Sequence, residues 1–288
     1  MEIVDAQIHE PDSIVPWEYG DESRLAMSCE LAREAMDSVG VDAALVNARV
    51  EFCTAAVSRY PERFGACVMA DVHTPDLDDF RSRKGMLALR VLLRSWNDGK
   101  LSKEFQEGGF ERLFAAAERN NIPVFAQAAG HIRALIPVIE AHPDLILILD
   151  HLGLNQQPSM VARDPWEQLR DVNALAKFPN VAVKLSGAPT LAQEPYPYRD
   201  IWPHVLSMVE AFGPQRLMWG SDFTRLRYAP RTVIRGPRDS WYGLYSDSVS
   251  FLRDTNEISR SDKELIFGGT IRHLLRWPRP TEASGSTM

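Results

Sequence analysis

The sequence predicts a single (β/α)8 barrel, and three observations lead to that prediction. Short apolar runs alternate with amphipathic segments of helical spacing along the whole 288-residue chain. Two of these runs, LILIL at 145–149 and VAVKLSG at 181–187, are almost continuously apolar or β-branched, which is typical of a parallel sheet covered on both faces. No linker rich in Ser, Gly or Pro divides the chain, so one large domain accounts for its length.

The predicted elements follow one another as strand and helix. The strands are expected at residues 2–9, 43–46, 64–69, 86–93, 123–128, 145–151, 181–187 and 217–222. The helices are expected at residues 23–38, 51–60, 101–120, 131–141, 166–177 and 198–212. A doubly wound open sheet is the main alternative, and the absence of a GxGxxG or GxxxxGK[ST] motif after the first strand disfavours it.

Three stretches complete the predicted organisation. The barrel is expected to occupy residues 1–277. Residues 278–288, PRPTEASGSTM, are small, polar and proline-bearing, which predicts a disordered tail. Residues 225–240 are rich in Arg, Pro and Gly, which predicts a long loop over one end of the barrel, and such loops often act as lids.

Composition and charge exclude several classes of protein. A hydrophobic fraction of 45% and a charged fraction of 25% are those of an ordinary soluble globular protein. The formal net charge of −7 disfavours nucleic acids and anionic membranes as partners. The expected partner is a small-molecule substrate, with a homodimer as the default assembly.

The cysteines and the first residues predict a compartment. Cys29, Cys53 and Cys67 lie far apart without CxxC spacing, which disfavours disulfides and a cysteine zinc site and favours a reducing environment. Acidic residues stand where a signal peptide needs a basic region, and no apolar stretch approaches the roughly 20 residues of a membrane span. We therefore expect a cytoplasmic protein.

The candidate site should lie at the carboxyl ends of the strands, where the loops of a barrel form a pocket. Asp5, Gln7 and His9 alternate at period two and are predicted to share the luminal face. A hydrogen-bonded polar plug at the bottom of the barrel is the alternative. Of the three residues, His9 is nearest the strand end and is the strongest functional candidate.

The basic and amide residues of the middle strands suggest contacts with an anion. Arg90 lies in an apolar strand and needs an anionic partner, either an internal carboxylate or a substrate carboxylate. Arg94 is expected at the rim, and Gln127, near the end of the fifth strand, is expected in the pocket. Lys184 is either a pocket cation or one side of a salt bridge between layers.

The most reactive candidates follow the sixth and eighth strands. His151 is well placed to polarise a carbonyl or transfer a proton, or else it caps the next segment, whereas Asp150 is expected to orient a neighbour. Asp222, close after Gly220, is the strongest general-base candidate, with a helix N-cap as the alternative. One carboxylate, two histidines and arginines suit the addition of water to a carbonyl, and the lack of GxSxG disfavours a serine triad.

Five segments together carry a resemblance to a known family. They are VDAQIHEP, GMLALRV, LILDHLG, VAVKLSG and LMWGSDF, in this order along nearly the whole chain. The chain resembles the amidohydrolase superfamily, specifically its amidohydrolase-2 branch, which includes lactonases such as 2-pyrone-4,6-dicarboxylate hydrolase and the sugar-lactone hydrolases, and also metal-dependent decarboxylases. This resemblance implies Asp222 as the base and His151 as the histidine of the sixth strand.

The chain departs from the family pattern at two positions. The pattern D-x-H-x-H is here Asp5-Ala6-Gln7-Ile8-His9, so Gln7 replaces the first histidine of the usual metal pair. Gln127 stands where the resemblance places a histidine on the fifth strand. Because a neutral amide is a weaker ligand than imidazole, both changes favour the lactonases that need no tightly bound metal. A loosely held Zn or Mn ion at His9, His151 and Asp222 stays open.

These observations lead to one hypothesis and two alternatives. Asp222 would take a proton from the water that opens a small, carboxylated lactone or related cyclic ester, while His151 and His9 hydrogen-bond the oxyanion. The substrate would be bound by five residues: Arg90, Arg94, Arg225, Gln7 and Gln127. The enzymatic alternative is a metal-dependent non-oxidative decarboxylase of an aromatic or unsaturated acid. A catalytically inactive barrel that binds a small anion or a protein partner is the other.

Overall fold

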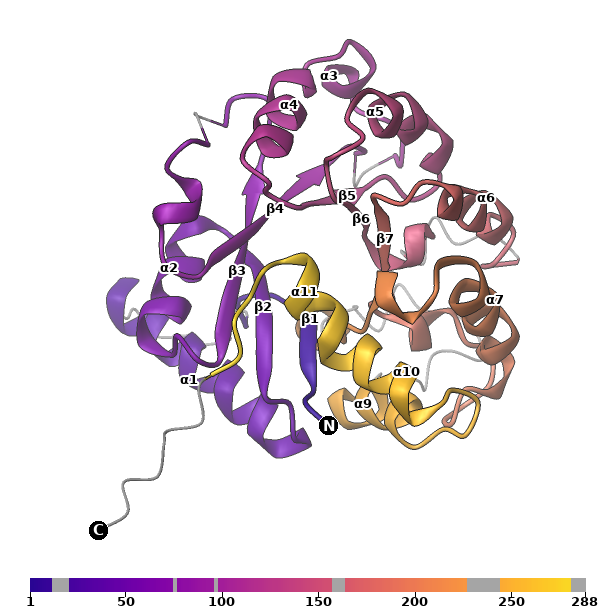
Figure 1. Cartoon of the computed structure of the whole chain (residues 1–288). Helices are drawn as coiled ribbons and strands as arrows, with labels where there is room; N and C mark the ends of the chain where they lie inside the picture. The colour runs from indigo at the N-terminus through magenta and orange to yellow at the C-terminus, as the bar shows by residue number, and fades with distance from the viewer. Residues whose placement is uncertain (12–20, 75–76, 96–97, 157–163, 227–243, 281–288) are drawn as a thin grey trace.

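Eight parallel strands form one sheet in the order β1 to β8, which confirms the predicted (β/α)8 barrel (Figure 1). The computed structural model describes residues 1–11, 21–74, 77–95, 98–156, 164–226 and 244–280. The strands are β1 Val4–Ile8, β2 Ala43–Ala48, β3 Phe64–Ala70, β4 Met86–Leu92, β5 Val124–Gln127, β6 Leu147–Leu149, β7 Val181–Lys184 and β8 Leu217–Met218. Each strand pairs in parallel with the next, and the helices lie around them (Figure 1).

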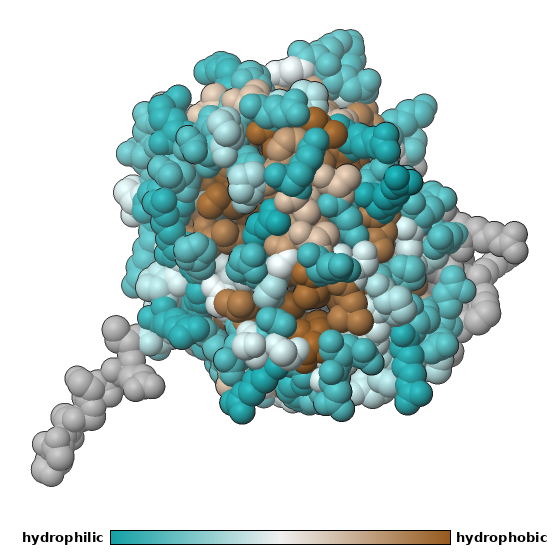
Figure 2. Space-filling model, turned by 45° about the vertical axis from the view of Figure 1, so that its right-hand side comes forward, coloured by the Kyte–Doolittle hydropathy of each residue, from teal (hydrophilic) through white to brown (hydrophobic). Residues whose placement is uncertain are grey.

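The helices lie outside the sheet and cover it. They are α1 Asp21–Val39, α2 Val50–Arg59, α3 Lys103–Gln106, α4 Glu111–Arg119, α5 Ile136–Ala141, α6 Leu169–Ala174, α7 Trp202–Phe212, α8 Phe223–Leu226, α9 Tyr245–Arg253, α10 Arg260–Glu264 and α11 Thr270–Leu274. Hydrophilic side chains cover most of the face seen in Figure 2, with hydrophobic residues between them. No helix in the described ranges is both long and apolar enough to span a membrane.

The helix predicted at 101–120 is wrong as a single element, because it divides into α3 and α4. Gly108 has a φ of +78°, in the left-handed region that favours glycine. A Cβ on Gly109 would lie 2.9 Å from the backbone oxygen of Glu104, so this position also requires glycine. The two glycines therefore end α3 and let the chain turn into α4.

The C-terminal helices α9, α10 and α11 were not among the predicted elements. A capping signal was present in the sequence, since the Ser259 hydroxyl accepts a hydrogen bond from the backbone N–H of Asp262 at the start of α10. A π-helical turn, Leu265–Gly269, joins α10 to α11. The Trp219 backbone N–H, just after β8, donates to the carbonyl of Ile266 in this turn, which anchors the segment against the barrel.

Backbone hydrogen bonds close the barrel between its first strand and the segment after its last. The N–H of Ala6 donates to the oxygen of Trp219, and the N–H of Asp222 donates to the oxygen of Gln7, both at 3.0 Å. Asp5 accepts from the backbone N–H of Ser221 at 2.8 Å and also from the Ser221 hydroxyl. These contacts hold Asp222 beside β1.

The lumen is filled by two layers of side chains. Every strand contributes to an apolar layer, made of Val4, Ala6, Ala43, Leu45, Cys67, Leu87, Ala88, Phe125, Ile148, Ala182 and Met218. Because side chains alternate along a strand, the residues two positions after Leu45, Ala88, Phe125, Ile148 and Ala182 also point inward. These are Asn47, Arg90, Gln127, Asp150 and Lys184, all buried. A buried polar layer thus lies on the carboxyl side of the apolar one.

Candidate active site

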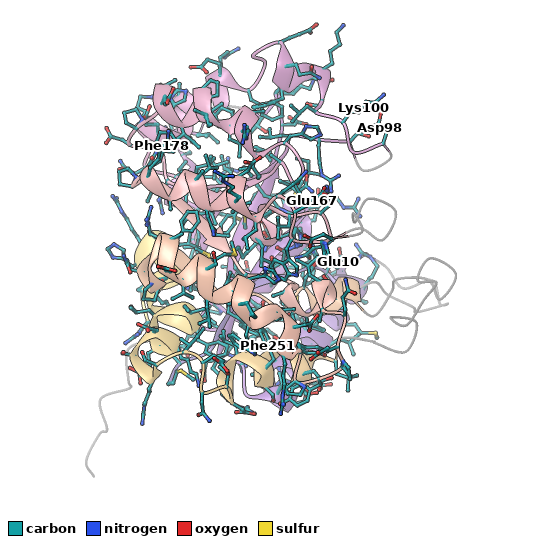
Figure 3. All side chains as sticks on the ribbon, turned by 90° about the vertical axis from the view of Figure 1, so that its right-hand side faces the viewer. Glu10, Asp98, Lys100, Glu167, Phe178 and Phe251 are labelled. Carbon is teal, nitrogen blue, oxygen red and sulfur yellow. The ribbon has the colours of Figure 1, made fainter. Side chains whose placement is uncertain are left out.

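Gln7, His9, His151 and Asp222 meet at the carboxyl end of the barrel. The amide nitrogen of Gln7 lies 3.1 Å from His9 Nε2, 3.3 Å from His151 Nε2 and 3.3 Å from Asp222 Oδ1. His9 Nε2 lies 3.1 Å from Asp222 Oδ1. All four residues are buried, Gln7 completely. Figure 3 shows the same end of the barrel through Glu10, Asp98 and Lys100, which follow β1 and β4.

The backbone after β6 and β8 turns sharply to bring these side chains into the mouth. His151, Leu152 and Asp222 have φ values of 52°, 59° and 55°, in the left-handed region that residues other than glycine seldom adopt. Such conformations cost roughly 1–3 kcal/mol each and persist where the surrounding structure fixes them. The hydrogen bond from Asp222 N to Gln7 O, and that from Gly153 N to Asp150 O, supply this restraint.

Hydrogen-bond partners determine which nitrogen of each imidazole carries a hydrogen. His9 Nδ1 donates to the backbone oxygen of Asn47, which leaves Nε2 facing Gln7 and Asp222. His151 Nε2 faces two donors, Gln7 Nε2 and, at 3.5 Å, Arg90 Nη2. It must therefore accept, and the hydrogen of the neutral ring lies on Nδ1, 3.4 Å from the Ser186 hydroxyl oxygen.

The charge states of the cluster follow from burial and from these contacts. Burial lowers the pKa of His151 to about 4, so its ring is neutral at pH 7. Burial alone would raise the pKa of Asp222, but the hydrogen bond with His9 and the positive charge of Arg90 lower it below its ordinary value. Asp222 is therefore an ionised carboxylate able to accept a proton.

Arg90 and Lys184 share the buried carboxylate of Asp150. Arg90 Nε lies 2.6 Å from Asp150 Oδ2, and Lys184 Nζ lies 2.6 Å from Asp150 Oδ1. Although burial opposes ionisation, the two cations hold the pKa of Asp150 well below its usual range. Of the two partners that the sequence left open for Arg90, the structure contains the internal carboxylate, and Lys184 likewise forms a salt bridge between strands. Arg90 also reaches His151, so this ion cluster supports the catalytic candidates.

Of the remaining substrate-binding candidates, Gln127 ends β5 and Arg94 follows β4. Gln127 belongs to the polar layer, is 2% exposed, and its Oε1 has no hydrogen-bond partner among the described residues. Arg94, just after β4, is 4% exposed, and burial lowers its pKa. The side chain of Arg225 lies outside the part of the chain that the structure describes, as do residues 227–240 of the predicted lid and 281–288 of the predicted tail.

Asp5 departs from the expected common face with Gln7 and His9. Its carboxylate accepts hydrogen bonds from the backbone N–H and the hydroxyl of Ser221. The pairing of β1 with β2 shifts in register between Asp5 and Ile8, which breaks the regular alternation on which that expectation depended. Asp5 therefore fastens the segment after β8 to β1 and does not join the cluster.

Two residues of the site were missed in the sequence. The Ser186 hydroxyl contacts both Gln7 and His151, and the backbone oxygen of Asn47 accepts from His9. Both positions carried a signal, because Ser186 lies two residues after Lys184 and Asn47 two after Leu45, on inward-facing positions.

Asp5 and His151 are expected to give stability opposite pH dependences. Burial raises the pKa of Asp5 to about 6, so the native state binds more protons than the unfolded state between pH 3.8 and 6, and stability falls as pH rises. His151 titrates at about 4 instead of 6.5, so stability rises with pH in that interval. The difference in unfolding free energy between each variant and wild type should therefore change as the pH rises from 4 to 6.5. For Asp5→Asn it should shift by about 3 kcal/mol in favour of the variant, and for His151→Gln by a similar amount in favour of wild type. Urea unfolding at several pH values measures this, and parallel curves for the three proteins would contradict it.

No group of three or more His, Cys, Asp or Glu side chains within the described ranges is arranged to hold a metal ion. His9, His151 and Asp222 are instead each within hydrogen-bond distance of Gln7. The donor set does not fit a metal site as it stands, because the group common to all three residues is an amide nitrogen, which carries hydrogens and is not a ligand.

Sequence comparison identifies relatives of this chain. A family model described as Amidohydrolase matches residues 15–277. An L-fucono-1,5-lactonase from Burkholderia ambifaria is 29% identical over 155 residues, which are 52% of this chain and 48% of the relative. A 4-sulfomuconolactone hydrolase from Rhizobium radiobacter is 37% identical over 84 residues, 28% of this chain and 26% of the relative. The chain thus matches less than half the length of either curated relative.

Structure comparison gives the same fold over nearly the whole chain. An amidohydrolase from Burkholderia multivorans, crystallised with bound zinc, superposes with a TM-score of 0.69 at 19% identity, covering 96% of this chain and 100% of that one. At 19% identity, this structural similarity establishes the fold and nothing about the activity of this chain.

Proposed function

Because the chain belongs to the amidohydrolase family, we propose that it is a hydrolase that opens a small, carboxylated lactone. The observation that carries this proposal is the ionised carboxylate of Asp222, buried between His9 and Gln7 at the catalytic end of the barrel. A buried, ionised carboxylate is suited to activating water. The names of the two curated relatives, a lactonase and a lactone hydrolase, support the substrate class.

The proposed reaction uses Asp222 twice. Asp222 takes a proton from water as the water oxygen bonds to the lactone carbonyl carbon, which gives a tetrahedral oxyanion. The bond between that carbon and the ring oxygen then breaks, and the ring oxygen receives the proton from Asp222, so the product is a hydroxy acid. His9 Nε2, 3.1 Å from Asp222 Oδ1, can hold the proton between the two steps.

The oxyanion needs donors, and the geometry changes which residues supply them. The amide of Gln7 presents N–H groups beside Asp222, and His9 presents one once its Nε2 holds the proton; losing one such donor typically costs about 10²–10³ in rate. His151 accepts at Nε2, so we assign it the role of orienting Gln7 and Arg90 in place of the donor role expected from the sequence.

Recognition of the substrate carboxylate is assigned to the rim. The charge of Arg90 is matched by Asp150, which makes Arg90 a support for the site. Arg94, with Arg225 and the amide of Gln127, is proposed to bind the carboxylate, because a guanidinium matches a carboxylate through two parallel hydrogen bonds. The proposed setting is the reducing cytoplasm, consistent with three free and buried cysteines.

A panel of lactones tests the proposal. The protein, washed with a chelator, is expected to open at least one carboxylated or sugar-acid lactone, with L-fucono-1,5-lactone and 4-sulfomuconolactone as the first compounds. Mass spectrometry should show the substrate plus one water. If no lactone opens and carbon dioxide is released from an aromatic or unsaturated acid only when a divalent metal is added, the decarboxylase alternative replaces this proposal.

A further inference from the structure

Gln7 is the centre of the candidate site, and its amide nitrogen faces three groups that could bind a metal. His9 Nε2, His151 Nε2 and Asp222 Oδ1 all lie within 3.1–3.3 Å of Gln7 Nε2. They come from the ends of β1, β6 and β8, so one side chain links segments as far as 215 residues apart. In a metal site, the ion makes these links.

A metal ion and the Gln7 amide compete for the same lone pairs. Zinc binds imidazole nitrogen and carboxylate oxygen at about 2.0–2.2 Å through those lone pairs. The amide nitrogen offers two hydrogens and no lone pair for coordination, so it can replace a cation as a donor but cannot bind one.

The orientation of the amide is fixed by its neighbours. Its nitrogen faces a carboxylate, which only accepts, and its Oε1 lies 3.4 Å from the Ser186 hydroxyl, which donates. Turning the amide over would place its oxygen against the oxygen of Asp222 and lose both contacts. The orientation that rejects a cation is therefore the stable one.

The side chain also has little freedom to withdraw. Gln7 is fully buried. Its backbone N–H donates to Asp5 Oδ1 at 3.0 Å, and its backbone oxygen accepts from the backbone N–H of Asp222, so the chain that carries the side chain is held at both groups. A Cβ placed on Gly220 would lie 3.4 Å from the Gln7 Cβ, which shows how closely the two segments pack. A rotation that vacates the centre of the cluster would have to displace this packing.

The charges nearby are already matched without an ion. Arg90 and Lys184 carry two positive charges, and Asp150 and Asp222 carry two negative charges, all on buried side chains. A divalent cation would add two positive charges to a buried and balanced group, where uncompensated charge is costly.

We propose that Gln7 takes the place of the metal ion in this barrel, holding His9, His151 and Asp222 around its amide nitrogen, whose two hydrogens the three groups share, and excluding zinc from the site. This role rests on the geometry of the four residues and not on the lactone reaction. It predicts that the identity of residue 7 alone decides whether the site binds a metal.

Zinc affinity measured without substrate tests the proposal. Gln7→His and Gln7→Glu each remove the amide donors and add a ligand, and both should bind one zinc ion at least about 100-fold more tightly than wild type. Gln7→Met is the matched control, since it removes the donors without adding a nitrogen or oxygen ligand, and its affinity should lie between that of wild type and those of the His and Glu variants. Competition with a chromophoric chelator gives the dissociation constants. Thermal unfolding provides a second readout, because zinc should raise Tm most in the His and Glu variants, less in Gln7→Met and not in wild type.

Each outcome decides the question. The proposal is overturned if wild type keeps one equivalent of zinc after a chelator wash, or if neither Gln7→His nor Gln7→Glu gains affinity. It is also overturned if Gln7→Met binds zinc no more tightly than wild type, because the amide donors would then not be what excludes the ion. If one ligand-bearing variant does not fold, the other decides. Failure of the lactone panel leaves these zinc results unchanged, so the two proposals fail separately.

Discussion

Replacing Asp222 with asparagine is expected to lower kcat for lactone opening by about 10²–10⁴-fold. Asparagine keeps the size of the side chain and an oxygen that can accept the hydrogen bond from Gln7, but it cannot take a proton from water. KM should change little, because the carboxylate is assigned to the proton transfer and not to ground-state binding. Steady-state kinetics on the best lactone of the panel measure both parameters.

An exposed aspartate supplies the control for this substitution. Asp254 directly follows α9 and pairs with Arg253 at the surface, so Asp254→Asn should retain wild-type turnover. The pH profile adds a second check, because the pKa of Asp222 is lowered below its ordinary value and the carboxylate therefore stays ionised across the neutral range. The contribution of Asp222 to kcat/KM should then be constant from pH 5 to 8. Wild-type turnover in Asp222→Asn would refute the assignment.

The largest effect on stability is expected at Asp150. Asp150→Asn leaves the Arg90 and Lys184 cations buried without their anion, and breaking a buried pair in this way costs about 3–5 kcal/mol of unfolding free energy. Denaturant unfolding measures the loss. Asp171→Asn is the matched control, since it removes an aspartate bound to Arg133 at 2.7 Å in an exposed pair worth about 0–1 kcal/mol.

A second substitution identifies the cause of that loss. If unpaired cations are responsible, adding Lys184→Met to Asp150→Asn should recover part of the stability, with a coupling energy of about 0.5–3 kcal/mol. Independent, additive losses would show that the damage comes from packing or from the Asn side chain itself. A loss in Asp150→Asn no larger than in Asp171→Asn would show that the buried carboxylate does not stabilise the fold.

The strands could be predicted from the sequence because each is short, apolar and bounded by turns. All eight observed strands lie within or overlap the expected ranges, since buried parallel strands leave a strong apolar signal. The helices were harder to predict where local geometry overrides the periodic pattern. Gly108 and Gly109 divide one expected helix, and α9 to α11 pack on the barrel through contacts that periodicity does not reveal.

The candidate site could be predicted only as far as each strand could be considered alone. Residues at the strand ends, such as His151 and Asp222, follow directly from position in the barrel. The partner of Arg90 could not be predicted, because Asp150 and Lys184 come from other strands and their juxtaposition depends on register. The register shift after Asp5 has no mark in the residue pattern either, and it redirected Asp5 to Ser221.

The contact between β1 and the segment after β8 has a consequence for the order in which the molecule is made. Gln7 leaves the ribosome 215 residues before Asp222, the residue to which its amide donates. At synthesis rates of about 5–20 residues per second, that separation is roughly 10–40 s of translation. Throughout this time Gln7 has been synthesised and Asp222 has not, so the candidate site is incomplete. The candidate site is therefore assembled last. A nascent chain that stalls before its eighth strand has no assembled active site.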